Sequence, residues 1–254
     1  MLDAIWEAGY DGVEIAQHPA QFGSAEELYG LLKRDDEDNP KYMKAGKTSQ
    51  HRTQGLKLIG LAGGSIEERV SFLDRLITAE NLALLDEKSA AHKFIRFDNY
   101  YPYIYIDTWN DSCCRELMER HYTLALHPHM FKPVQTAKEA EKLLEAHPAL
   151  RFLPDTAHLT VAGEKVLEVL DKNYDRIVAV HLKDWTPEFG RSYQFYSTGF
   201  SVRFGEGDVQ LDNIVDFLKS RRYNKWLIVE QDVVENPCGA AQAHRRWLKD
   251  THGI

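Results

Sequence analysis

The chain of 254 residues is poor in cysteine and has no long hydrophobic run. It holds three cysteines, two of them adjacent (Cys113 and Cys114), which cannot build a disulfide framework. The longest apolar runs, such as 58–62 and 177–180, are far too short to span a bilayer. The opening MLDAIWEAGYDG carries acidic residues where a secretory signal needs basic ones. We therefore expect a reduced, cytoplasmic protein without a leader or a membrane segment.

An excess of positive charge is also missing. Lys and Arg number 31 against 39 Asp and Glu, which gives a net charge of −8 with histidine neutral. Binding to nucleic acid or to an anionic membrane needs a concentrated basic face. We therefore expect neither partner. The 43% of hydrophobic residues is ample for a core.

The sequence also lacks a glycine-rich nucleotide-binding motif, since GLAGGS matches neither G-x-G-x-x-G nor a P-loop. What recurs instead is a short apolar strand, a loop and an amphipathic helix. Strands are predicted at 11–16, 56–61, 93–97, 122–127, 150–154, 177–182 and 226–229. Helices are predicted at 24–33, 66–78, 111–120, 136–146, 164–171, 211–220 and 239–252. The aromatic stretch 100–109 is open between strand, lid and interface. This α/β alternation favours a parallel barrel over a doubly wound sheet.

Titratable side chains stand where five of these strands end. They are Glu14, then His127 and His129, then Asp155 and His158, then His181, Lys183 and Asp184, and finally Glu230. Carboxyl ends of barrel strands converge on one face, and imidazoles with carboxylates suit a divalent cation. Each residue also has an ordinary interpretation: the His-x-His pair as a polar rim, Asp155 as a helix N-cap. One shared site explains them together.

Several segments give the chain a resemblance to a known family. They are GYDGVEIA, GLKLIGLAGGS, LALHPHMFKPVQTAKEAEKLL, FLPDTAHLTVAG, VAVHLKDW and FGEGDVQLDNIVDFLKSRRYNKWLIVEQD. The chain resembles the xylose isomerase-like sugar phosphate isomerase/epimerase family, most closely its inosose dehydratase-like branch. The resemblance implies one (β/α)₈ TIM barrel domain over 1–254 that lacks its first strand or has it truncated, because the chain starts inside the following helix. The first strand and the region 82–120 are where the chain departs from the family.

The resemblance also implies a site with one divalent metal ion, held by His127, Asp155, His181 and Glu230. His129 has the same strand phase as His127 and could replace it. The ligand set favours Mn²⁺, Co²⁺, Zn²⁺ or Fe²⁺ over Mg²⁺. The residues expected to contact substrate are Glu14, His158, Lys183 and Asp184.

The chemistry expected of such a site begins with removal of a proton beside a polarised carbonyl, which leaves an enediolate. Returning the proton gives isomerisation or epimerisation of a keto-sugar or keto-inositol, and loss of a β-hydroxyl gives dehydration. Glu230 is expected to be a ligand and a candidate acid/base, His158 or His129 to carry the proton, and Lys183 to steady the oxyanion.

Two other functions remain open. A catalytically inactive barrel could serve as a binding or regulatory module, and the missing first strand supports that alternative. A metal-dependent endonuclease of the same superfamily would need a basic face, which the charge count opposes. A small carbohydrate is the expected ligand, and a homodimer is left open.

Overall fold

The computed structural model describes residues 2–16, 21, 24, 27, 57–62, 64–85, 103–120, 122–187, 200, 202–232 and 234–254. The chain divides into two compact units, 1–104 and 105–254. The predicted helix 24–33 lies almost wholly outside the described residues, and the predicted strand 93–97 lies wholly outside them.

The first unit contains α1 (Leu2–Glu7), β1 (Gly12–Ile15), β2 (Lys57–Leu61), α3 (Ile66–Leu85) and the start of β3 (Tyr103–Ile106). β1 pairs with β2 and β2 with β3, both in parallel. Gly60 lies opposite Tyr103, and a Cβ at Gly60 would collide with the Tyr103 ring. The ring occupies that space, and its hydroxyl donates to the Glu14 carboxylate. The strand β3 therefore settles the open interpretation of the aromatic stretch 100–109 in favour of a strand over 103–106.

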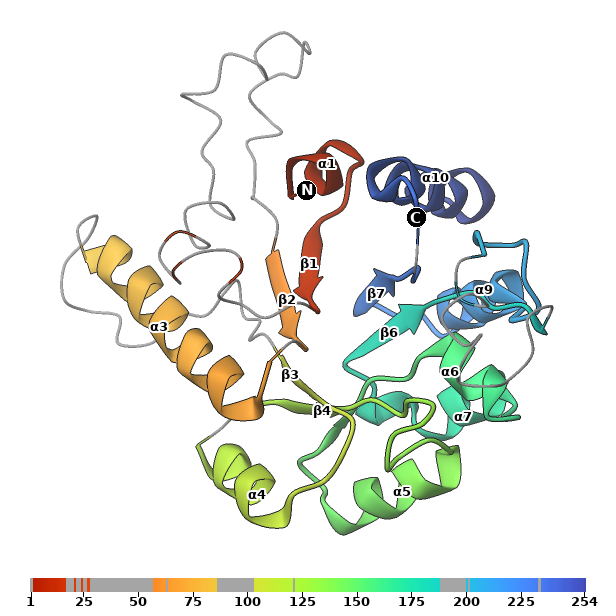
Figure 1. Cartoon of the computed structure of the whole chain (residues 1–254). Coiled ribbons are helices and arrows are strands. Elements are labelled where there is room, and N and C mark those ends of the chain that lie inside the picture. Colours follow the sequence, from red (N-terminus) through yellow and green to blue (C-terminus); the bar gives the residue numbers. More distant parts are fainter. Residues whose placement is uncertain are drawn as a thin grey trace, which may run out of the picture. The chain divides into compact units, whose positions relative to one another are not determined.

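The second unit continues the alternation of strands and helices. It contains, after the end of β3, α4 (Asp111–Glu119), β4 (Leu124–Leu126), α5 (Ala137–Ala146), β5 (Arg151–Phe152), α6 (Thr156–Val161), α7 (Val166–Lys172), the 3₁₀ helix η5 (Tyr174–Arg176), β6 (Ala179–Leu182), α9 (Leu211–Ser220), β7 (Trp226–Val229) and α10 (Pro237–His252). The helices α4, α5, α7 and α9 lie outside strands β4, β6 and β7 (Figure 1). The short helix α6 is not among the predicted elements.

Backbone hydrogen bonds pair neighbouring strands of the second unit. β4 pairs in parallel with β5, and β6 with β7. Parallel bridges join Phe152 to Ile177 and Asp155 to His181, so β5 adjoins β6. Parallel strands are covered on both faces and read as continuous apolar runs. The strand residues that are fully buried here are Leu124, Ala125, Leu126, Phe152, Ala179, Val180 and Leu182.

Local sequence signals explain where several helices begin. Thr136 caps α5 by accepting from the Glu139 backbone N–H, and the Glu139 carboxylate accepts in return from the Thr136 N–H at 2.9 Å. This is a complete capping box. Among the described residues, no helix is both long and apolar enough to cross a membrane.

Candidate metal centre

The four residues predicted as ligands stand at the carboxyl ends of neighbouring strands in the second unit. His127 follows β4, Asp155 lies just beyond β5, His181 lies in β6 and Glu230 follows β7. Backbone N–H groups hold them in place: His127 donates to Ile106 O at 2.8 Å, His181 to Pro154 O at 2.9 Å and Glu230 to Leu182 O at 3.0 Å. Parallel pairing therefore brings all four ends to one edge.

Asp155 is fully buried, and its two carboxylate oxygens have different surroundings. Oδ1 accepts the backbone N–H groups of Ala157 and His158, both at 2.8 Å, and so caps α6. Oδ2 is buried without any hydrogen-bond partner. It lies 3.8 Å from His158 Nε2 and 3.9 Å from His181 Nδ1, too far for a hydrogen bond. Burial raises the pKa of Asp155 to about 7. A buried, unpaired carboxylate oxygen between two imidazoles fits a cation ligand.

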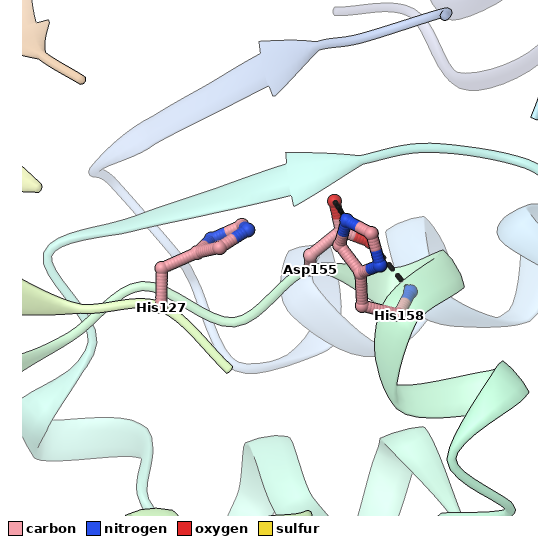
Figure 2. Close-up of side chains that lie close together, drawn as sticks. All are labelled: His127, Asp155 and His158. Atoms are coloured by element: carbon pink, nitrogen blue, oxygen red, sulfur yellow. Dashed lines mark hydrogen bonds and ion pairs between the residues drawn. The ribbon is translucent and has the colours of Figure 1, made fainter. Parts of the chain in front are cut away.

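Ligand atoms gather around Asp155 in two overlapping groups. One contains His127, Asp155 and His158, and the other contains Asp155, His181 and Glu230. The ligand atoms within each group all lie within 4.8 Å of one another. Figure 2 shows the His127 side chain pointing toward Asp155 and His158. The four predicted ligands are thus divided between two groups that share Asp155. The first group also contains His158, which was predicted to contact substrate and to carry a proton.

The imidazoles are held in defined orientations. His127 Nδ1 donates to the Leu153 carbonyl at 3.1 Å, which leaves Nε2 with its lone pair for a ligand. Burial, followed by the neighbouring His181, holds the pKa of His127 well below its usual value. Burial and then Lys183 do the same for the pKa of His158. Both rings are therefore neutral, which is the form that binds metals.

His129 is the alternative ligand on the β4 end. Its Nδ1 donates to the Met130 carbonyl at 2.8 Å, and its ring centroid lies 3.9 Å from that of His158. The ligand groups formed among the described residues contain His127 in place of His129. Burial lowers the pKa of His129, so it too is a neutral imidazole beside the site.

Glu230 and a buried lysine complete the centre. Glu230 Oε2 accepts from His181 Nδ1 at 2.6 Å, and Oε1 accepts from Lys183 Nζ at 2.7 Å. Burial by itself raises the pKa of Glu230, but Lys183 and His181 together bring it well below its usual value. Burial disfavours the charged form of Lys183, yet Glu230, Asp155 and Asp232 together raise its pKa. Lys183 is thus a fixed positive charge at neutral pH.

Asp232 also lies at the end of the last strand, where the sequence carries Glu230-Gln231-Asp232, but no role was predicted for it. Its Oδ1 lies 3.0 Å from Lys183 Nζ. It stands two residues after Glu230, and this spacing keeps the same side of an extended strand. This i, i+2 spacing from Glu230 is the sequence signal for a role of Asp232 in the site.

Asp184, a predicted substrate contact, accepts four backbone hydrogen bonds in the structure. Its Oδ1 accepts from the backbone N–H groups of Trp185 and Val209, at 2.9 and 3.3 Å. Its Oδ2 accepts from those of Gly205 and Gly207, at 2.9 and 3.1 Å. Burial raises the pKa of Asp184, which these backbone bonds oppose. Both carboxylate oxygens of Asp184 therefore accept hydrogen bonds from the protein backbone. Glu14, another of the four predicted substrate residues, belongs to the first unit.

The comparisons with known proteins agree with this architecture. The sequence model of the family described as xylose isomerase-like TIM barrel matches residues 99–251. The chain belongs to this family. The resemblance drawn from the strand-end segments is thereby confirmed.

Several curated relatives carry the name inosose dehydratase. An inosose dehydratase of Geobacillus thermodenitrificans is 31% identical over 149 residues, covering 54% of this chain and 50% of the relative. An inosose dehydratase of Clostridium botulinum (strain Eklund 17B) is 32% identical over the same length and coverage. The chain thus spans about half the length of the curated relatives it matches.

Solved structures show the same fold at low sequence identity. The probable 3-DHS dehydratase AsbF of Bacillus anthracis has a TM-score of 0.63 at 15% identity, covering 98% of this chain and 92% of that one. The IOLI protein with a bound zinc atom has a TM-score of 0.61 at 15% identity, covering 98% and 91%. The chain therefore has the α/β fold of these barrels over nearly its whole length.

Proposed function

We propose that the chain is a divalent-metal-dependent isomerase, epimerase or dehydratase that acts on a keto-sugar or keto-inositol through an enediolate. The observation that carries the proposal is Asp155 Oδ2, a buried carboxylate oxygen with no hydrogen-bond partner between two imidazoles. Leaving such an atom unsatisfied costs about 1–3 kcal/mol. A cation would remove that cost.

The ligands in this proposal are His127, Asp155, His181 and Glu230. All four come from the ends of separate strands, and His127 has its Nε2 lone pair available. A set rich in imidazole supports Mn²⁺, Co²⁺, Zn²⁺ or Fe²⁺ ahead of Mg²⁺, which prefers oxygen ligands. A cation bound there would polarise a substrate carbonyl as a Lewis acid.

Proton transfer is assigned to the neutral imidazoles. His158 is buried and unprotonated, so it can accept a proton from the carbon beside a carbonyl. His129, whose ring centroid lies 3.9 Å away, is the second candidate for this role. The Glu230 carboxylate accepts hydrogen bonds from both His181 and Lys183. These bonds favour a role for Glu230 as a metal ligand over a role as the base that removes the proton. Lys183 supplies positive charge that offsets the negative charge developing on a substrate oxygen.

The substrate class is supported by the relatives. Inosose dehydratases match half of the chain in sequence, and a 3-keto-D-glucoside 4-epimerase of E. coli shares its fold with a TM-score of 0.61 at 16% identity. Dehydration and epimerisation share the same first step, the removal of a proton beside a carbonyl. We therefore propose a polyhydroxylated ketone as the substrate, without choosing between the two outcomes.

The first test is the metal content of the purified chain. We expect near-stoichiometric Mn, Co, Zn or Fe in the wild type and none in the Asp155→Ala/Glu230→Ala double variant. Asp111→Asn, which removes an exposed carboxylate paired with Arg115, is the matched control and should keep the metal. Full metal occupancy in the double variant would refute the proposed ligands.

The second test follows the reaction itself. Keto-inositols and ketoses are incubated with the metal-loaded chain in deuterated water, and the products are read by NMR. Deuterium entering the position beside the carbonyl supports the common proton-removal step, and a new double bond or a new epimer shows how it ends. Bound metal with no exchange on any substrate would refute catalysis and indicate a binding module.

A further inference from the structure

The ammonium group of Lys183 is enclosed on three sides. Its side chain is 1% exposed, with Nζ 2.7 Å from Glu230 Oε1 and 3.0 Å from Asp232 Oδ1. On the third side, Nζ lies 4.6 Å from the ring centroid of Phe200. The Phe200 ring is fully buried, and it meets the His158 ring edge-on at 5.1 Å. One aromatic ring thus covers both the fixed cation of the site and the proposed proton acceptor.

This arrangement has a physical consequence for Lys183. A buried ammonium is stable only if charge and hydrogen-bonding partners replace water. Two carboxylates provide the charge, and the face of the ring adds a cation–π contact while keeping water away. The ammonium group of Lys183 therefore pairs with the carboxylates of Glu230 and Asp232 instead of with water.

The segment 205–209 is hydrogen-bonded to Asp184 and Trp185, the two residues that follow Lys183. Asp184 collects the backbone N–H groups of Gly205, Gly207 and Val209. The Trp185 carbonyl accepts the Asp208 N–H at 2.7 Å. A Cβ on Gly207 would collide with Asp184 Oδ1 and the Trp185 carbonyl, so the chain approaches as closely as glycine allows.

The other side of this segment is held by α10. The Phe204 ring centroid lies 4.1 Å from that of His244 and 5.5 Å from that of Trp247. His244 Nε2 in turn donates to Gln231 Oε1 at 2.8 Å, next to Glu230 in the chain. The residues 202–209 are thus fixed from both sides.

We propose that Phe200 and Asp184 are positioning residues for Lys183. Phe200 excludes water from the ammonium, and Asp184 fixes Gly205, Gly207 and Val209, a few residues further along the chain. The functional consequence for catalysis rests on the proposed function. The enclosure of Lys183 is independent of the proposed function, because it involves side chains of the protein and neither a metal ion nor a substrate.

The test is the rate at which Lys183 reacts with an amine-acylating reagent, read peptide by peptide by mass spectrometry on the metal-free chain. Lys165 and Lys249 on the surface serve as internal standards. In the wild type, we expect Lys183 to react far more slowly than either. In Phe200→Leu, we expect its rate to rise about tenfold relative to them, because a desolvated cation–π contact is worth about one factor of ten or more.

Phe217→Leu is the matched control, since it removes an aromatic ring from α9 and keeps an apolar side chain. We expect it to leave the Lys183 rate unchanged, with both variants folded by circular dichroism. Asp184→Asn should raise the rate as Phe200→Leu does. A wild-type rate equal to that of the surface lysines, or an equal rise in both phenylalanine variants, would overturn the enclosure. A rise in Phe200→Leu without one in Asp184→Asn would overturn the role of Asp184.

The two proposals fail in different ways. An absence of metal binding would refute the proposed function and leave the labelling pattern of Lys183 as predicted. In a metal-loaded, active chain, Phe200→Leu should lower kcat while KM changes little, because the ring touches Lys183 and His158. A change confined to KM would refute a positioning role in the chemical step.

Discussion

Replacing Asp155 with asparagine or alanine separates the two roles of this side chain. Oδ1 caps α6 through two backbone N–H groups, whereas Oδ2 has no hydrogen-bond partner. Asp155→Asn keeps a carbonyl oxygen for the cap and replaces Oδ2 by an amide nitrogen, which cannot bind a cation. Asp155→Ala removes both oxygens. The two variants should therefore differ in stability and agree in cation binding.

The magnitudes follow from the separate surroundings of the oxygens. Loss of an N-cap costs about 0.5–2 kcal/mol, so metal-free Asp155→Ala should unfold more easily than Asp155→Asn by about 1 kcal/mol. Metal-free Asp155→Asn should have about the stability of the wild type, because one buried polar atom without a partner, Oδ2, is replaced by another, the amide nitrogen. A cation at 100 times its Kd stabilises the wild type by about 2.7 kcal/mol, or about 5–11 °C in Tm. Neither variant should gain that stability.

The assay is differential scanning calorimetry with and without Mn²⁺, Co²⁺ or Zn²⁺. Because burial raises the pKa of Asp155 to about 7, the cation competes with a proton, and the stabilisation of the wild type should weaken as the pH falls through 7. Equal cation stabilisation of Asp155→Asn and the wild type would refute Oδ2 as a ligand. Equal metal-free stability of the two variants would refute the division of labour between the oxygens.

Three further predictions concern the framework around the site, each measured by urea unfolding. Gly207→Ala should destabilise the chain by about 1–3 kcal/mol, because its methyl group would collide with Asp184 Oδ1; an unchanged midpoint would refute this. Burial lowers the pKa of His244 to about 4, against about 6.5 unfolded, so its neutral form contributes stability above pH 6.5 that is lost as the pH falls through 4. The free energy of unfolding should fall by at most about 3 kcal/mol over this pH range, and this fall should be absent in His244→Gln. The same pH dependence in that variant would exclude His244 as its source. Thr136→Ala should cost about 1 kcal/mol through its capping box, and no loss would contradict that role.

The sequence predicted best the elements whose pattern is local. The helix α9 and the strand β7 have the predicted bounds, 211–220 and 226–229, because the first is an amphipathic run and the second a short apolar run, WLIV, set apart by polar and turn residues. The strand β3 could not be decided from YIYI, since aromatic residues suit strands, lids and interfaces alike. The helix α6 is only six residues long, which is too short for a helical period to appear. The truncated first strand and the single domain stay predictions.

The site was predictable where strand ends carry metal-binding side chains, and unpredictable where distant segments meet. The parallel alternation and the family resemblance together point to His127, Asp155, His181 and Glu230. In the structure these four residues fall into two groups that share Asp155. Nothing in the local sequence connects Phe200 with Lys183. The bonds from Asp184 to Gly205 and Val209 span more than 20 residues, so its carboxylate could be taken for a substrate ligand.

Asp155 shows why an ordinary local explanation and a functional one need not compete. As a residue shortly after a strand and directly before a helix, it is fully explained as an N-cap, and the structure contains that cap. The cap uses only Oδ1, however, and by fixing the carboxylate it also fixes the direction of Oδ2 toward His158 and His181. The capping role thus belongs to one carboxylate oxygen, Oδ1, and the proposed ligand role to the other, Oδ2. The helix cap is therefore the device that orients the proposed ligand.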